Sequence, residues 1–234
     1  MKSPKAPFIA RKRRDVLITL AATAGLAVAG CKGRTGERIE ARGKHEEAEV
    51  TPGEDLMQEH GVLERILLVY DEASRRIELR EQLDPSIIKR AATMVRRFVE
   101  DYHEKLEEQF VFPRLQKARR ETTLVAVLLR QHQRGRELTD EIVRRAGAAE
   151  AAELAQLLRA FGSMYRPHLA REDTVLFPAF RDVVGGDNYR ELGEEFEDKE
   201  HALFGKQGFH DVVRQVADLE RALELDDLAR FTPA

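Results

Sequence analysis

The sequence has little material for cross-links or strands. It contains one cysteine, 15 glycines, four tyrosines and no tryptophan among 234 residues. A single cysteine excludes an intramolecular disulfide framework and any metal site built from several thiolates. No useful stretch alternates apolar and polar side chains, so no β-strand is predicted. Lysine and arginine (39) nearly balance aspartate and glutamate (42), so the charge gives no reason to expect a nucleic acid partner.

The chain is instead rich in helix-forming residues, chiefly Leu, Ala, Glu and Arg. From Glu54 onward, apolar residues recur with the spacing of an amphipathic helix. The pattern predicts an all-α fold, an up-down-up-down four-helix bundle with extra C-terminal helices. The bundle helices are expected at residues 54–82, 86–115, 121–146 and 149–180, and the extra helices at 189–204 and 210–225.

Composition divides the chain into four parts. We expect a signal and lipobox segment, a flexible tether rich in Gly, Arg and Glu, a helical bundle, and a C-terminal helical extension. In the same order these parts are residues 1–31, 32–53, 54–182 and 187–231.

The N-terminal segment has the form of a bacterial export signal. A basic stretch ending in Arg13 and Arg14 precedes an apolar run, Val16 to Gly30, which is too short for a comfortable bilayer span. The run ends at Cys31, where the sequence resembles a lipobox, and the paired arginines resemble a twin-arginine signal. We therefore expect an exported lipoprotein of the bacterial cell envelope, held to the membrane through lipidated Cys31. An uncleaved anchor helix is the alternative.

Two segments that lie 65 residues apart read almost alike. His103 is followed by Glu107 and by Phe112-Pro113, and His168 is followed by Glu172 and by Phe177-Pro178 at the same offsets. Residues four apart lie on one face of a helix, roughly 6 Å from each other. Each segment therefore directs an imidazole and a carboxylate the same way. Pro113, Pro167 and Pro178 are also expected to kink or distort their helices.

Two further histidines occupy core-facing positions, His60 beside Leu56 and Leu63, and His132 four residues after Leu128. A lone core histidine is usually just hydrogen-bonded, and a His–Glu pair is commonly a surface ion pair. Buried carboxylates without partners are costly, however, so four histidines and two glutamates at similar depth indicate a bound cation. Imidazole and carboxylate ligands without thiolate suit iron, manganese or zinc, and there are too many for one tetrahedral zinc.

These residues resemble the hemerythrin-like, or HHE, cation-binding family. The resemblance covers about residues 54–180 and implies a four-helix bundle around a non-haem centre of two iron ions. It implies these metal ligands: His60, His103, Glu107, His132, His168 and Glu172. Asp173 is an alternative to Glu172, because it has the spacing of the last ligand in the oxygen-carrying members.

Two departures from the oxygen carriers bear on function. Arg136 stands where their second histidine of the third helix would be, and Glu104 follows His103 as in the iron-sensing branch. Glu104 is therefore a further candidate ligand, although its neighbours Glu100 and Glu108 are also consistent with a solvated face. Tyr165, three residues before His168, is interpreted as a core residue or as a hydrogen-bond donor near the site.

The sequence thus predicts an exported, membrane-tethered di-iron protein that binds or senses dioxygen or a related small ligand, or holds iron. The carboxylate-rich ligand set should favour the ferric state and so disfavour reversible oxygen carriage. A ferroxidase, peroxidase or nitric-oxide-reducing enzyme is one alternative, and a zinc-binding or metal-free bundle is another. A binding protein is favoured over an enzyme, and the oligomeric state is left open.

Overall fold

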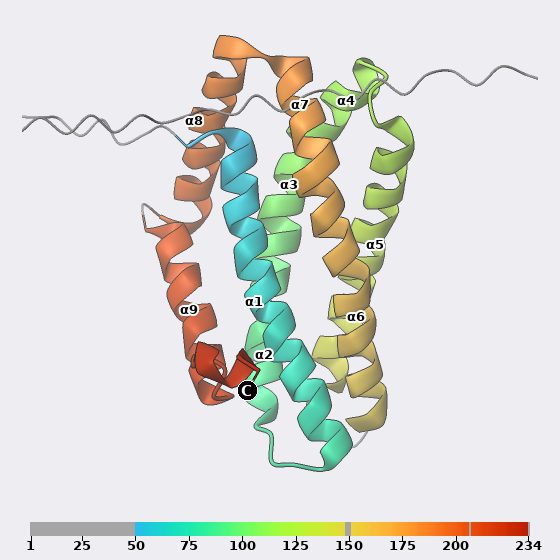
Figure 1. Cartoon of the computed structure of the whole chain (residues 1–234), viewed down its shortest axis with the longest axis vertical. Helices are drawn as coiled ribbons and strands as arrows, with labels where there is room; N and C mark the ends of the chain where they lie inside the picture. The colour runs from blue at the N-terminus through green and yellow to red at the C-terminus, as the bar shows by residue number, and fades with distance from the viewer. Residues whose placement is uncertain (1–49, 148–150, 206, 234) are drawn as a thin grey trace, which may run out of the picture. The chain divides into compact units, whose positions relative to one another are not determined.

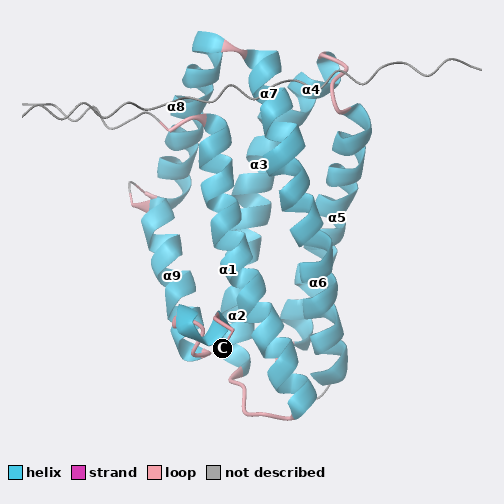
Figure 2. Cartoon of the chain, viewed as in Figure 1, coloured by secondary structure: helices cyan, strands magenta, loops and turns pink. Residues whose placement is uncertain are grey.

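The computed structural model describes residues 50–147, 151–205 and 207–233. Within these ranges every regular element is helical and none is a strand (Figure 2), so the all-α prediction is confirmed. The predicted signal segment and Cys31, with the tether up to residue 49, lie outside the described residues. In the described part of the chain, no helix combines the length and the apolar character that crossing a membrane requires.

Long helical rods lie side by side and form a bundle (Figure 1). The first rod is α1 (Pro52–Leu79) and the third is α5 (Thr122–Arg145). The second rod is continuous from Pro85 to Lys117 and contains α2 (Pro85–Met94), α3 (Glu104–Leu106) and α4 (Phe112–Lys117). The fourth is continuous from Ala151 to Val184 and contains α6 (Ala151–Arg171) and α7 (Phe177–Val184).

Local sequence signals set the ends of the first two rods. Thr51 and Glu54 form a reciprocal capping box, with the Thr51 N–H donating to Glu54 Oε2 at 3.0 Å, and proline occupies the first turn. The Asp84 carboxylate caps α2 by accepting from the Ser86 N–H at 2.9 Å. Helix α1 ends earlier than predicted, because Arg80 adopts a left-handed conformation with φ 56°.

Three π-helical segments interrupt the second and fourth rods: η1 (Val95–His103), η2 (Glu107–Val111) and η3 (Glu172–Leu176). The N–H of Phe112 bonds to the carbonyl of Glu107, five residues back, just before Pro113. A proline ring clashes with the carbonyl four residues back in an α-helix, and a π turn relieves that clash. The predicted distortions are therefore confirmed near Pro113 and Pro178. At Pro167 the chain keeps its α-helical assignment, with the proline inside α6, so the expected kink there stays a prediction.

The π turns change which side of the second rod faces the interior. Residues four apart along an α-helix drift by about 40° per step, so such a row soon leaves the core. Here π turns offset the drift, and a row at four-residue spacing is buried throughout: Val95, Val99, His103, Glu107, Val111 and Leu115. Glu100 and Glu104 are buried as well, with relative exposures of 0% and 1%. The solvated-face interpretation of these two residues was therefore wrong.

The C-terminal extension forms two helices as predicted, α8 (Gly186–Phe204) and α9 (Gly208–Ala222), followed by a short 3-10 turn, η4 (Leu228–Phe231). Both helices pack along α1 (Figure 1). The Gly53 N–H donates to the Tyr189 hydroxyl at 3.0 Å, and Arg65 Nε donates to Glu220 Oε1 at 2.9 Å. The extension thereby covers a long side of the first bundle helix.

Candidate metal centre

Six buried side chains meet inside the bundle, and each of its four rods contributes at least one. All are at most 3% exposed. They are His60 of α1, His103 of η1, Glu107 of η2, His132 of α5, His168 of α6 and Glu172 of η3. These are the six ligands that the resemblance implied.

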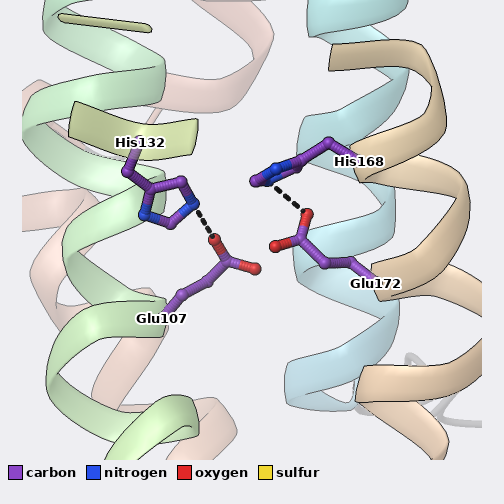
Figure 3. Close-up of side chains that lie close together, drawn as sticks. All are labelled: Glu107, His132, His168 and Glu172. Atoms are coloured by element: carbon purple, nitrogen blue, oxygen red, sulfur yellow. Dashed lines mark ion pairs between the residues drawn. The ribbon is translucent and has the colours of Figure 1, made fainter. Parts of the chain in front are cut away.

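The six residues form two overlapping groups that share Glu107. One group joins Glu107 to His60 and His103, and the other joins it to His132, His168 and Glu172. Within each group the candidate ligand atoms all lie within 4.8 Å of one another. In Figure 3 the carboxylates of Glu107 and Glu172 face each other between the two imidazoles of the second group. Glu107 therefore lies where the two groups meet.

The Nε2 atoms of all four histidines point inward. His168 Nε2 lies 3.0 Å from Glu172 Oε2, and His132 Nε2 lies 3.4 Å from Glu107 Oε2. On the other side, the Nε2 atoms of His60 and His103 are 3.0 Å apart. His103 Nε2 is 3.7 Å from Glu107 Oε2. One nitrogen of every ring is thus placed beside a carboxylate or another imidazole.

The opposite ring nitrogen, Nδ1, has an oxygen acceptor in every case. The acceptors for His60, His103, His132 and His168 are, in that order, Asp173 at 2.7 Å, Glu59 at 2.6 Å, Glu108 at 3.2 Å and Gln131 at 3.0 Å. An acceptor at Nδ1 favours the tautomer that carries its proton there, which leaves the Nε2 lone pair free for a metal ion.

Most of the inner ligand atoms form no hydrogen bond. Both oxygens of Glu107, both oxygens of Glu172 and the Nε2 of His132 have no hydrogen bond, although all are buried. Two adjacent buried carboxylates would repel each other and would lose their hydration without compensation. A cation between them supplies that compensation, and a donor set of imidazole and carboxylate without thiolate is one that iron, manganese and zinc accept.

Protonation of the metal-free cluster follows from burial and charge. Burial lowers the pKa of His103 and of His168 to about 4, so both rings are neutral near pH 7. Burial raises the pKa of Glu172 to about 7. Burial also acts against the charged form of His132, but the carboxylates of Glu107 and Glu108 more than offset it and raise its pKa to about 10. A metal ion therefore binds in competition with protons.

Glu104 lies outside this inner set. Its Oε1 accepts a hydrogen bond from the Tyr165 hydroxyl at 2.7 Å, and its Oε2 accepts one from Arg136 Nη2 at 2.5 Å. It approaches His132 on the Nδ1 side, at 3.9 Å, where Arg136 also pairs with Glu108 at 2.6 Å. Glu104, Glu108 and His132 thus form a third group whose ligand atoms lie within 4.8 Å of one another, but Arg136 already pairs with both of its carboxylates.

Asp173 and Tyr165, for which the sequence left alternatives open, both lie beside the six residues. Asp173, whose side chain is 36% exposed, bonds to the outward nitrogen of His60, while Glu172 points inward. Tyr165 is buried as the core interpretation expected, and its hydroxyl is also the hydrogen-bond donor to Glu104. Tyr165 fits because Gly135 leaves room: a Cβ at that position would lie 1.9 Å from the hydroxyl oxygen.

Replacing Gly135 with Ala is expected to lower the free energy of unfolding by about 1–3 kcal/mol, because the added methyl group displaces Tyr165 from Glu104. Gly61→Ala is the matched control. Nothing lies within 4 Å of a Cβ at Gly61, so alanine there is expected to stabilise α1 by about 1 kcal/mol. Urea unfolding of the metal-free proteins measures both changes. Equal effects of the two substitutions would contradict the close packing at Gly135.

The sequence interpretation missed the acceptors Glu59, Glu108 and Gln131. Glu59 carried a readable signal, since it follows Leu56 by three residues and precedes Leu63 by four, which places it on the buried stripe. Gln131 and Glu108 sit next to His132 and Glu107 in the sequence, but only the relative placement of two helices brings them to a histidine.

Comparison with known proteins gives a consistent picture. Residues 51–180 match the family model described as the hemerythrin HHE cation binding domain. Uncharacterized proteins of Mycobacterium tuberculosis and Mycobacterium bovis are each 45% identical to the chain over an alignment of 240 positions. The alignment spans 98% of this chain and 94% of each relative. No solved structure is significantly similar to the chain.

Proposed function

The chain belongs to the hemerythrin HHE cation-binding domain family, and we propose that it holds two iron ions in an up-down-up-down four-helix bundle. The single observation that carries this proposal is the set of unpartnered inner atoms. Four buried carboxylate oxygens, on Glu107 and Glu172, have no hydrogen bond and lie among four inward imidazole nitrogens. Cations among these atoms would compensate the buried carboxylates and satisfy the free imidazole nitrogens.

The donors divide naturally between two ions. His60 and His103 with Glu107 would hold one ion, and His132 and His168 with Glu172 and Glu107 would hold the other. Each ion would then have two histidines and at least one carboxylate, and two histidines with one carboxylate is a donor set typical of non-haem iron sites that keep open coordination positions. Iron bound there would supply a redox-active centre with room for a small ligand such as dioxygen.

We further propose that the centre senses a small ligand or holds iron rather than carrying oxygen reversibly. Arg136 stands in the position of the oxygen carriers' additional histidine. Its guanidinium donates hydrogen bonds to Glu104 and Glu108 and has no lone pair with which to bind a metal ion. The inner set therefore has one imidazole fewer than that of the oxygen carriers, and it keeps two carboxylates, Glu107 and Glu172. Anionic ligands stabilise the ferric state relative to the ferrous state, which works against a reversible ferrous complex.

Metal analysis of protein purified without added metal tests the proposal. We expect two irons per chain and an increase in melting temperature when iron is added to the stripped protein, since a ligand that binds only the folded state stabilises it. Zinc in place of iron would support the structural alternative, and no bound metal would refute a metal centre. Turnover of ferrous iron, peroxide or nitric oxide by the loaded protein would support the enzymatic alternative.

We also propose that the chain is exported and tethered to the bacterial cell membrane through lipidated Cys31. The support is the apolar run from Val16 to Gly30 that ends at the chain's single cysteine. Cell fractionation of the wild type and a Cys31→Ser variant tests it. We expect the wild type with the membranes and the variant released from them, and equal release of both proteins would refute the lipid anchor.

A further inference from the structure

A cavity of about 410 Å³ lies between the second rod and the C-terminal extension. This volume is within the range of small-molecule sites in proteins. One wall comes from α2 and η1, and the other comes from the end of α8 and from α9. None of the six candidate metal ligands is among its described lining residues. The cavity is therefore a feature of the molecule separate from the metal centre.

The interior of the cavity is largely apolar. Met94 and Phe98 of the second rod and Val212 of α9 line it and are buried. Phe204 of α8 is half-buried, and its ring centroid lies 5.8 Å from that of Phe98. Leu203, on the same wall as Phe204, is 58% exposed. An apolar body in the cavity would cover this leucine and remove its surface from water, which favours binding.

The walls have few polar groups that could bind a polar body. The Thr93 hydroxyl donates to the Lys89 carbonyl at 2.8 Å. None of the described lining residues has a buried side-chain nitrogen or oxygen that lacks a hydrogen bond. Gly208 has no side chain, which lets α9 start against α8, since a Cβ there would lie 2.5 Å from the Cβ of Phe204. The interior thus fits a hydrocarbon chain better than a body that needs hydrogen bonds.

The wall formed by the second rod also has basic side chains, and all are exposed: Lys89, Arg90 and Arg97. Within the described residues none of them forms an ion pair. Asp211, the one carboxylate among the described lining residues, is already paired with an arginine of its own helix. The Lys89 amine turns toward Gly147, where a Cβ would lie 3.5 Å from it. Arg90 and Arg97 are therefore the two cations best placed to meet an anion.

We propose that this cavity binds a fatty-acid carboxylate, with its acyl chain against Phe98 and Phe204 and its carboxylate at Arg90 and Arg97. A planar guanidinium pairs with a carboxylate through two parallel hydrogen bonds, and burial of the chain supplies the apolar part of the binding free energy. The observations favour a single chain over a bilayer, because the apolar residues line a cavity between two elements and do not form an outer face. The site is independent of the proposed metal-binding function.

Isothermal titration calorimetry of the full-length Cys31→Ser protein with dodecanoate, kept below its micelle-forming concentration, tests the site. This parent protein lacks the proposed lipid anchor and so needs no detergent. We expect one dodecanoate per chain. Adding Arg90→Gln/Arg97→Gln should weaken binding about 10-fold or more, because the charged partners of the carboxylate are lost. Adding Leu203→Ser should weaken it about 5-fold through lost apolar contact.

An Arg130→Gln/Arg144→Gln variant of the parent protein is the matched control. It removes the same charge from exposed positions of α5, a helix that contributes none of the described lining residues. Its affinity for dodecanoate should equal that of the parent. Dodecyltrimethylammonium, which has the same chain and the opposite charge, should not bind. Equal affinity of the two double variants, or equal affinity for the two amphiphiles, would overturn the proposal.

Vesicles of phosphatidylglycerol distinguish the cavity from a membrane-binding surface. Vesicle binding that depends on Arg90 and Arg97 and that dodecanoate does not displace would overturn the proposal and assign the two arginines to lipid headgroups. Absence of dodecanoate binding by the parent protein would also overturn it. Neither result changes the expected metal content, so the proposed metal centre stands or falls separately.

Discussion

Glu107→Gln is expected to remove both metal ions while leaving the metal-free bundle folded. Glu107 is the residue shared by the two ligand groups, so its loss weakens both halves of the site. In the absence of metal its Oε2 lies 3.4 Å from His132 Nε2 and favours the charged form of that imidazole, so the neutral amide replaces a buried ion pair by a weaker polar contact of the same shape. The loss of metal binding is therefore the main effect of this substitution.

Metal content per chain and thermal unfolding with and without added iron measure the two effects of this substitution. The wild type should gain stability on iron addition, by about 4 kcal/mol when iron is at a thousand times its dissociation constant, and Glu107→Gln should gain almost none. Glu104→Gln is the matched control three residues away. It should keep both ions, because the oxygens of Glu104 are bonded to Tyr165 and Arg136. Loss of metal from the control but not from Glu107→Gln would reverse the assignment.

The predictable part of this site is the part encoded by helical spacing. The repeated His-x3-Glu pairs and the stripe positions of His60 and His132 indicated a common interior location, and the structure brings all of them together. The helix boundaries were predictable to within a few residues for the same reason. Both inferences need only the regular geometry of an α-helix and the cost of burying charge.

Helical spacing could not reveal that Glu100 and Glu104 are buried, because their burial depends on π turns that depart from regular α-helical geometry. A constant rotation of 100° per residue puts Glu104 well to the side of His103, whereas the π turns on either side keep Glu100 and Glu104 inside. The proline after each motif signalled an irregular turn, but not how it would rotate residues upstream. The acceptors behind the histidines were missed because they depend on side chains from neighbouring helices.

The burial of Glu104 makes Arg136 the most consequential residue outside the inner set. Arg136→Ala is expected to lower the free energy of unfolding of the metal-free protein by about 3 kcal/mol, because it leaves a buried carboxylate beside Glu108 without its cation. Arg144→Ala is the matched control on the same helix. Its side chain is 66% exposed and lies 4.0 Å from Glu141, so the change should be within about 0.5 kcal/mol.

A second substitution separates charge compensation from packing at Arg136. If the cost of Arg136→Ala arises from the uncompensated carboxylate, adding Glu104→Gln should recover most of the lost stability, because the amide can still accept from Tyr165. Urea unfolding of both single variants and the double variant gives the coupling directly. Additive losses would mean that the arginine acts through packing alone. Strong coupling would mean that Glu104 and Arg136 behave as one unit, in which the arginine takes the place of a ligand and neutralises the carboxylate behind His132.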